Sequence, residues 1–183
     1  MRILGISGSL RRGSHNRRLL RAAGDALPPG AVLVEWEGLA GLPAFDEDLE
    51  ASPPESVQGL FDAIEDADAL LIATPEYNAS LPGALKNALD WASRPFPDNV
   101  LRDKPAAVIG ASTGLFGAVW AQAEVRKALK ASGAHVLENE LPVGLADGAF
   151  DGDSLADPEL GARLGDLLGD LCREIRAPVE QSA

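Results

Sequence analysis

Short apolar runs alternate with longer amphipathic segments along the whole chain. Five apolar runs predict strands, at residues 2–7, 31–36, 69–74, 106–111 and about 135–141. Three of them are continuously apolar, as is typical of parallel strands that are covered on both faces. Five segments with helical spacing of apolar residues lie between or after the strands, at 15–26, 54–66, 82–93, 117–132 and 158–176. This alternation predicts an α/β protein with a five-stranded, doubly wound parallel sheet and helices on both faces.

Residues that begin and end helices support these assignments. Ser14 and Ser80 are suited to cap the first and third helices, and Pro53 opens the second. Gly133 follows the fourth helix, where a left-handed residue commonly ends a helix. Two long stretches, 37–52 and 142–157, have no regular pattern. Such connections usually cover a ligand or join subunits, although a plain surface loop explains 142–157 equally well.

The length of 183 residues fits a single domain, residues 1–183. An apolar fraction of 46% is ordinary for a globular protein. The one cysteine, Cys172, lies on an apolar helical face and excludes an internal disulfide and a cysteine-based metal cluster. We therefore expect a buried thiol and no metal site. The short apolar run at the start and the absence of a membrane-length segment predict a cytoplasmic protein without a membrane partner.

Positive charge is concentrated at the start of an acidic chain. Residues 1–24 contain six arginines and no acid, whereas the whole chain has a net charge of −12. This distribution favours a small anionic ligand and argues against nucleic acid, which requires a broad basic surface. We expect Arg17, Arg18 and Arg21 to be solvated residues on the first helix and Arg11 to contact the anion.

The loop after the first strand has the composition of a phosphate site. It contains Ser9, Leu10, Arg11, Ser14, His15 and Asn16. Hydroxyl groups, a guanidinium and the N–H groups at a helix start can all donate to one anion. His15 is expected to contribute its backbone N–H. The loop lacks the Gly-Lys-Ser/Thr of nucleotide triphosphate sites and the Gly-x-Gly-x-x-Gly of dinucleotide sites. A phosphate monoester, such as that of FMN, remains.

Two further loops should meet the first one, because ligands of open parallel sheets bind beyond the carboxyl ends of the strands. The loop after the third strand contains Pro75, Glu76, Tyr77 and Asn78, and its exposed main chain suits a planar heteroaromatic ring. The loop after the fourth strand contains Ser112, Thr113 and Gly114, which permit close approach of the backbone to a ligand.

Residues 1 to about 145 resemble a known family, the NADPH-dependent FMN reductases, which include quinone, chromate and azo-dye reductases. The resemblance rests on the loop with Gly8-Ser9-Leu10-Arg11, Ser14 and Asn16, and on a longer block. That block runs through Pro75-Glu76-Tyr77-Asn78, Pro82-Gly83, Leu85-Lys86-Asn87, Asp90-Trp91 and Ser93-Arg94-Pro95.

The resemblance implies a flavodoxin-like fold, with strand order 2-1-3-4-5, that binds FMN non-covalently. Ser9, Arg11, Ser14 and Asn16 would hold the phosphate, Pro75 to Asn78 would line the isoalloxazine ring, and Ser112 to Gly114 would close the site. NADPH or NADH would reduce the flavin by hydride transfer, and a quinone, free flavin, azo compound or chromate would then be reduced in a ping-pong cycle. The resemblance also implies a homodimer or homotetramer. The flavin supplies the chemistry, so no catalytic side chain is named. Trp91 is expected in the core or at an interface.

Three other interpretations remain open from the residues. A flavodoxin-type electron carrier would bind FMN without consuming NAD(P)H itself, but the low aromatic content of 5% argues against it. A dinucleotide enzyme could use Glu35 or Glu37 on a ribose, although its glycine fingerprint is missing. A phosphate-binding regulator would show no turnover and no colour.

Overall fold

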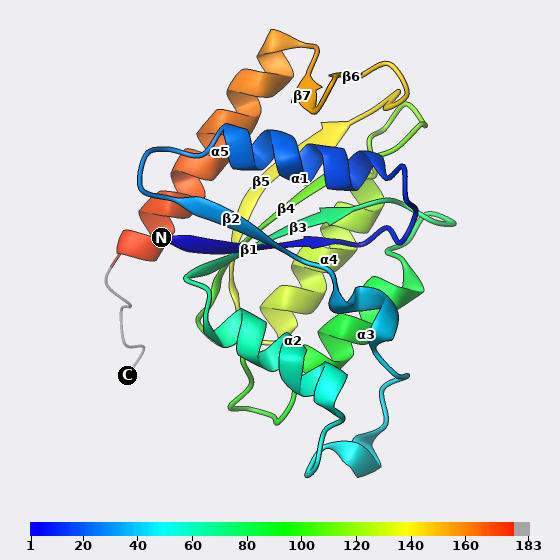
Figure 1. The fold of residues 1–183 in the computed structure, drawn as a ribbon, viewed down its shortest axis with the longest axis vertical. Coiled ribbons are helices and arrows are strands. Elements are labelled where there is room, and N and C mark those ends of the chain that lie inside the picture. Colours follow the sequence, from blue (N-terminus) through cyan, green and yellow to red (C-terminus); the bar gives the residue numbers. More distant parts are fainter. Residues whose placement is uncertain (178–183) are drawn as a thin grey trace.

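The middle strands of the sheet are formed by uninterrupted apolar sequence. The structure, a computed structural model, describes residues 1–177. Strands β1 (Arg2–Ser7), β3 (Ala69–Thr74) and β4 (Pro105–Ala111) are buried along almost their whole length. Strands β2 (Val32–Trp36) and β5 (His135–Val143) are more exposed and lie at the two edges. All five are parallel in the order β2-β1-β3-β4-β5 (Figure 1), which confirms the predicted topology.

Five helices cover the two faces of this sheet (Figure 1). They are α1 (His15–Asp25), α2 (Glu55–Glu65), α3 (Gly83–Ala92), α4 (Val119–Ala131) and α5 (Pro158–Arg176). Alternate residues of β3 serve the two faces, as the period of two in a strand requires. Leu70 and Ile72 pack with α2, α3 and α4, whereas Leu71 and Ala73 pack with α1 and α5. The doubly wound α/β architecture is therefore confirmed.

The strand order determines where loops can meet. From β1 the chain passes to β2 on one side, and it then returns to β3 on the other side of β1. The connections that leave β1 and β3 consequently diverge, which opens a crevice at their carboxyl ends. In Figure 1 this is the end of the sheet at which α1 begins.

The two long connections contain short regular elements that the sequence pattern did not reveal. The first holds two 3₁₀ turns, η1 (Gly38–Gly41) and η2 (Glu47–Leu49). The second holds an antiparallel hairpin of β6 (Phe150–Asp151) and β7 (Ser154–Leu155). Elements of two to four residues are too short to show a hydrophobic period.

Of the two predicted N-caps, the one for α1 is confirmed and the one for α3 is not. Ser14 caps α1, since its Oγ accepts the N–H of Arg17 at 3.2 Å. The predicted cap Ser80 is wrong, because α3 begins after Pro82 and Ser80 donates instead to Glu124. Trp91 is 1% exposed and lies in the core. Within residues 1–177, no helix combines the length and apolarity that crossing a membrane requires.

Candidate functional site

A cavity of about 170 Å³ opens at the carboxyl ends of β1, β3 and β4. All three loops that the sequence singles out contribute to it. The cavity is lined by Ser9, Arg11, Ser14, His15, Asn16, Pro75, Glu76, Tyr77, Ala111, Ser112 and Thr113. All of these residues except Ala111 are among the predicted site residues. The structure thus brings together residues that are about 100 positions apart in the chain.

The first loop passes close to the neighbouring strand because it starts with a glycine. A Cβ at Gly8 would lie 3.0 Å from the Leu85 side chain and 3.2 Å from the Pro75 ring. The N–H of Gly8 donates to the carbonyl of Ala73 at 2.8 Å, which ties the loop to β3. Beyond this anchor, the small side chain of Ser9 is buried against the cavity. A larger residue at position 8 would therefore displace the loop.

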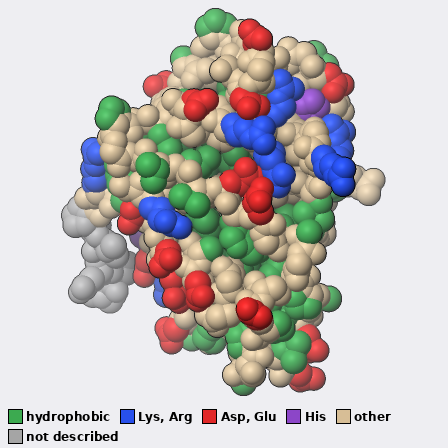
Figure 2. All heavy atoms as spheres, in the orientation of Figure 1, with side chains coloured by type: hydrophobic (Ala, Val, Ile, Leu, Met, Phe, Trp, Pro, Cys, Tyr) green, Lys and Arg blue, Asp and Glu red, His purple; other side chains and the backbone are tan. Residues whose placement is uncertain are grey.

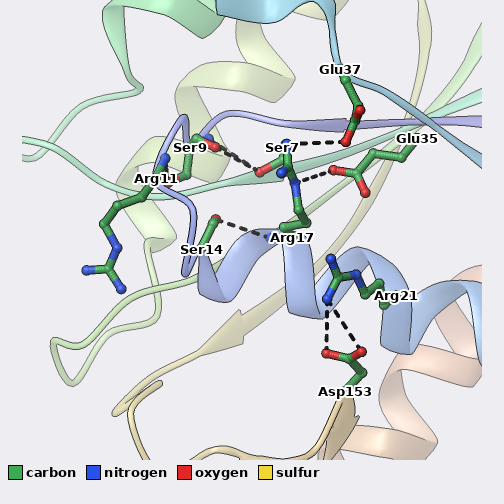
Figure 3. A network of polar contacts seen from close by, with 9 residues as sticks. All are labelled: Ser7, Ser9, Arg11, Ser14, Arg17, Arg21, Glu35, Glu37 and Asp153. Atoms are coloured by element: carbon green, nitrogen blue, oxygen red, sulfur yellow. Dashed lines mark hydrogen bonds and ion pairs between the residues drawn. The ribbon is translucent and has the colours of Figure 1, made fainter.

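Arg11 is the cationic side chain of this cavity. Its Nη2 donates to the carbonyl of Gly13 at 2.9 Å, so the guanidinium folds back over the loop. Figure 3 shows Arg11 extending away from Arg17, which lies on the other side of the loop beside Glu35. The remaining donor groups of Arg11 are exposed and available to an anion.

Arg17 has a different partner and does not line the cavity. Its Nε lies 2.7 Å from Oε1 of Glu35, and its Nη2 lies 3.9 Å from Oε1 of Glu37 (Figure 3). The expectation that Arg17 is merely solvated is therefore wrong. The two carboxylates that a dinucleotide enzyme would direct at a ribose are paired with a helix α1 side chain instead.

Arg18 and Arg21 hold the β6–β7 hairpin against α1. The Arg18 guanidinium lies 4.7 Å from the centre of the Phe150 ring, and its Nε donates to the Gly152 carbonyl at 3.1 Å. Nη1 of Arg21 lies 3.5 Å from the carboxylate of Asp153 (Figure 3). Arg21 is an exposed residue on α1, as expected, whereas Arg18 is partly buried under the hairpin. Figure 2 shows the basic side chains gathered over α1 and the loop before it.

The side chains of His15 and Asn16 are engaged by the protein itself. Nε2 of His15 lies 3.1 Å from Oδ1 of Asp147, and its ring stacks on Phe150 with centroids 6.1 Å apart. The Asn16 amide exchanges two hydrogen bonds of 2.9 Å with the backbone of Ala111 and is 2% exposed. The first N–H groups of a helix have no acceptor within it. Both residues line the cavity, and their role toward an anion stays a prediction.

The second loop forms a tight turn at the mouth of the cavity. Tyr77 and Ser80 exchange backbone hydrogen bonds of 3.0 and 3.1 Å. The two residues between them, Asn78 and Ala79, have φ of 54° and 60°, as in a type I′ turn. The backbone of this loop is thereby held in one conformation. Tyr77 is half exposed beside it.

Glu76 links the second loop to α4. Its Oε2 accepts the N–H of Trp120 at 3.1 Å and that of Ala121 at 3.2 Å. A carboxylate at the amino end of a helix is stabilised by the helix dipole and by these donors. Glu76 thus lines the cavity and also fixes α4 against it. No local sequence signal could reveal this contact, because the partners are 44 residues apart.

The third loop supplies Ser112 and Thr113 to the cavity. Ser112 Oγ accepts the N–H of Gly114 at 3.0 Å, which shapes the turn. Three predicted site residues, Leu10, Asn78 and Gly114, are neighbours of lining residues but lie outside the lining. Their roles stay predictions.

Comparison with known proteins identifies the family. The family model of NADPH-dependent FMN reductases matches residues 1–148. The chain belongs to this family. The predicted function is thereby confirmed, because this FMN-dependent NAD(P)H oxidoreductase is an enzyme whose cofactors are FMN and NAD(P)H. The interpretation as an electron carrier without turnover is not supported.

Individual relatives agree with this assignment. An NAD(P)H-dependent FMN reductase from Pseudomonas aeruginosa is 43% identical over 177 residues, which cover 96% of this chain and 89% of the relative. A 2-hydroxy-1,4-benzoquinone reductase from a Burkholderia species is 44% identical over 126 residues, which cover 69% of this chain and 68% of the relative. Among solved structures, the flavoenzyme NAD(P)H:(acceptor) oxidoreductase of Paracoccus denitrificans superposes with a TM-score of 0.83 at 35% identity. That match covers 96% of this chain and 97% of the other.

Proposed function

We propose that this reductase holds FMN in the cavity at the carboxyl ends of β1, β3 and β4 and transfers electrons from NAD(P)H to quinones. The observation that carries the proposal is the convergence of the three loops on one cavity, which combines a cationic side chain, hydroxyl groups and exposed main chain. The whole chain would act as one FMN-binding domain. We place the reaction in the cytoplasm, because it consumes NAD(P)H.

The amino end of α1 fits a phosphate monoester. Arg11 offers a guanidinium, Ser9 a hydroxyl group, and His15 and Asn16 their backbone N–H groups. A Cβ at Gly13 would meet nothing within 4 Å, so the loop is open at this point. The positive end of the helix dipole adds to the attraction for a dianion. Ser14 caps the helix through its hydroxyl and so keeps these donors in place.

The second and third loops fit a planar ring with polar edges. Pro75 and Tyr77 offer apolar surface, while the backbone of the turn is held rigidly by its two hydrogen bonds. Ser112 and Thr113 face the same cavity from β4. Such a surface can contact one face of a heteroaromatic ring and leave the other open to a second substrate.

Bound FMN would supply the redox chemistry, as an acceptor of hydride from NAD(P)H and a donor of electrons to the substrate. The task of the chain is to bind and orient the ring. The cavity is open to water, so solvent can provide the protons that quinone reduction needs. No side chain of the site has to act as an acid or base.

A quinone is the acceptor class that we propose. Two relatives carry names of quinone reductases, one from Burkholderia and one from Pseudomonas putida, the latter 42% identical over 125 residues. Steady-state oxidation of NADPH and of NADH by the FMN-loaded protein tests the assignment. We expect consumption of at least one of them that depends on the quinone, with the parallel reciprocal plots of a ping-pong reaction. A protein that retains FMN but consumes neither NADPH nor NADH with quinones would contradict it.

We also propose that the protein assembles as a homodimer or homotetramer. Support comes from an exposed groove between α3 and α4, which is lined by Leu81, Lys86, Ala128 and Ala131, among others. The groove combines apolar surface with the charged side chains of Lys86 and Glu124. A second copy of the chain that presents the same surface could pair its lysine with this glutamate and its glutamate with this lysine.

A further inference from the structure

Exposed apolar side chains are concentrated at one end of the molecule. Most of the large apolar side chains that residues 1–177 expose lie on the loops at the carboxyl ends of the strands or in the first turn of α4. These side chains are Leu10, Tyr77, Leu115, Phe116, Trp120 and Leu145. A cluster of apolar groups in one place on the surface usually marks a binding region.

Two aromatic rings form the centre of this region. Phe116 and Trp120 are in edge-to-face contact, with centroids 5.3 Å apart and an interplanar angle of 68°. Phe116 is 59% exposed and Trp120 is 50% exposed, so each ring still presents much of its surface to solvent. Leu115 and Leu145, at 69% and 61%, extend the apolar surface beside them.

The position of the pair relative to the cavity is fixed by backbone contacts. Glu76, which lines the cavity, accepts the N–H of Trp120 at 3.1 Å. Phe116 follows the lining residue Thr113 by three positions. Between the two aromatics, Gly117 has φ of 57°, and a Cβ there would lie 2.5 Å from the backbone of Pro142 and Val143. The turn is thus packed closely against the end of β5.

We propose that Phe116 and Trp120 form the contact surface for the ring of the quinone and thereby select planar aromatic acceptors. This inference rests on the proposed function, and it adds two residues that lie outside the cavity lining. A neutral aromatic ring gains from stacking and from burial of apolar surface, whereas a compact, hydrated anion gains from neither. The pair adjoins two residues of the cavity lining, because the N–H of Trp120 donates to Glu76 and Phe116 follows Thr113 by three positions, and this argues for a small acceptor as its occupant.

The test compares two acceptors with the FMN-loaded enzyme. For Trp120→Ala and Phe116→Ala, we expect kcat/KM for a two-ring naphthoquinone to fall about tenfold, which corresponds to about 1.4 kcal/mol. With ferricyanide, a compact inorganic anion, kcat/KM should change less than about twofold. Trp120→Phe should restore most of the activity with the quinone. Phe96→Ala is the matched control, because Phe96 is 68% exposed in the segment after α3 and does not belong to the region.

The outcomes separate the inference from the function beneath it. Equal losses with both acceptors, or no loss with either, would overturn the contact surface while leaving the quinone reductase in place. A Trp120→Ala protein with altered molar mass and unchanged selectivity would show a subunit contact instead and would also overturn it. A wild-type enzyme that reduces ferricyanide but no quinone would overturn the proposed acceptor as well.

Discussion

At the scale of single residues, arginines with the same chemistry serve different purposes according to their partners. Arg11 lines the cavity, Arg17 pairs with Glu35, and Arg21 pairs with Asp153. The last two partners lie 18 and 132 residues further along the chain, so a local sequence pattern could not reveal them. In the sequence, Arg11 differed from Arg17 and Arg21 only in its position, because it lies in the loop after the first strand and they lie on the first helix.

Replacement of Arg11 by alanine should weaken FMN binding selectively. A hydrogen bond between charged groups is worth about 1.5–3 kcal/mol, so the Kd for FMN should rise about 10- to 150-fold. The Kd for riboflavin, which lacks the phosphate, should stay unchanged. Fluorescence titration measures both values. Arg12→Ala is the control, because it removes the same charge from a residue outside the cavity lining. Equal losses in the two variants would exclude a specific contact of Arg11.

At the scale of elements, α4 is tied to the loop before α3 by two carboxylates. Glu76 receives the first N–H groups of α4, and Glu124 on α4 accepts from the Ser80 hydroxyl and from the Leu81 N–H at 3.1 Å. The hydrogen bond from Ser80, followed by that from Leu81, lowers the pKa of Glu124 below its ordinary value of 4.5. These reciprocal contacts hold the loop after β3 against the helix.

The contact between Ser80 and Glu124 makes the stability of the fold depend on pH. The folded-state pKa of Glu124 is below that of the unfolded chain. The contact therefore contributes fully above about pH 4.5, and its contribution is lost as the pH falls through the folded-state pKa. Ser80→Ala should lower the urea midpoint at pH 7, and the difference from wild type should shrink below pH 4.5.

Ser93→Ala provides the control for that experiment. The Ser93 hydroxyl donates to the backbone carbonyl of Asp90 at 2.8 Å, an acceptor that does not titrate. The effect of Ser93→Ala on the urea midpoint should therefore be the same at pH 7 and below pH 4.5. A Ser80→Ala effect that is equally independent of pH would refute the role of the Glu124 carboxylate.

The sequence was sufficient for the elements and the loops but not for the contacts between them. The continuous apolar run of β3 and the helical spacing of apolar residues in α5 predicted the layers, and the residues that follow β1, β3 and β4 predicted where the cavity lies. The second role of Glu76 and the partner of Ser80 depend on α4, about 44 residues away. The hairpin around Phe150 is held by α1 rather than by its own sequence. Local patterns contain no information about such partners.

At the scale of the whole molecule, the strand order concentrates binding groups at one end. The loops after β1, β3 and β4 meet because those strands are neighbours, and β5 adds Leu145 to the same end. The N–H of Leu145 donates to the carbonyl of Gly114 at 3.0 Å, which joins the last connection to the site. The connection 142–157 therefore packs against α1 and is hydrogen-bonded to the loop after β4.

The mass of the protein in solution tests the proposed assembly. Light scattering after size-exclusion chromatography should give two or four times the chain mass of 19.1 kDa, because the groove between α3 and α4 would be covered by a second copy. Ala131→Glu, in that groove, should shift the protein toward monomers by adding a buried charge. Ala26→Glu, at a solvent-exposed position after α1, is the control. A mass of one chain for the wild type would contradict the assembly.

The most direct test of the central claim is the visible spectrum of the protein after loading with FMN and desalting, followed by anaerobic addition of NADPH or NADH. The structure and the family predict that the protein stays yellow after desalting and that the colour bleaches promptly with at least one of the two reductants. A protein that loses its colour on desalting, or stays yellow with both reductants, would contradict the claim that these three loops hold a flavin for reduction by NAD(P)H.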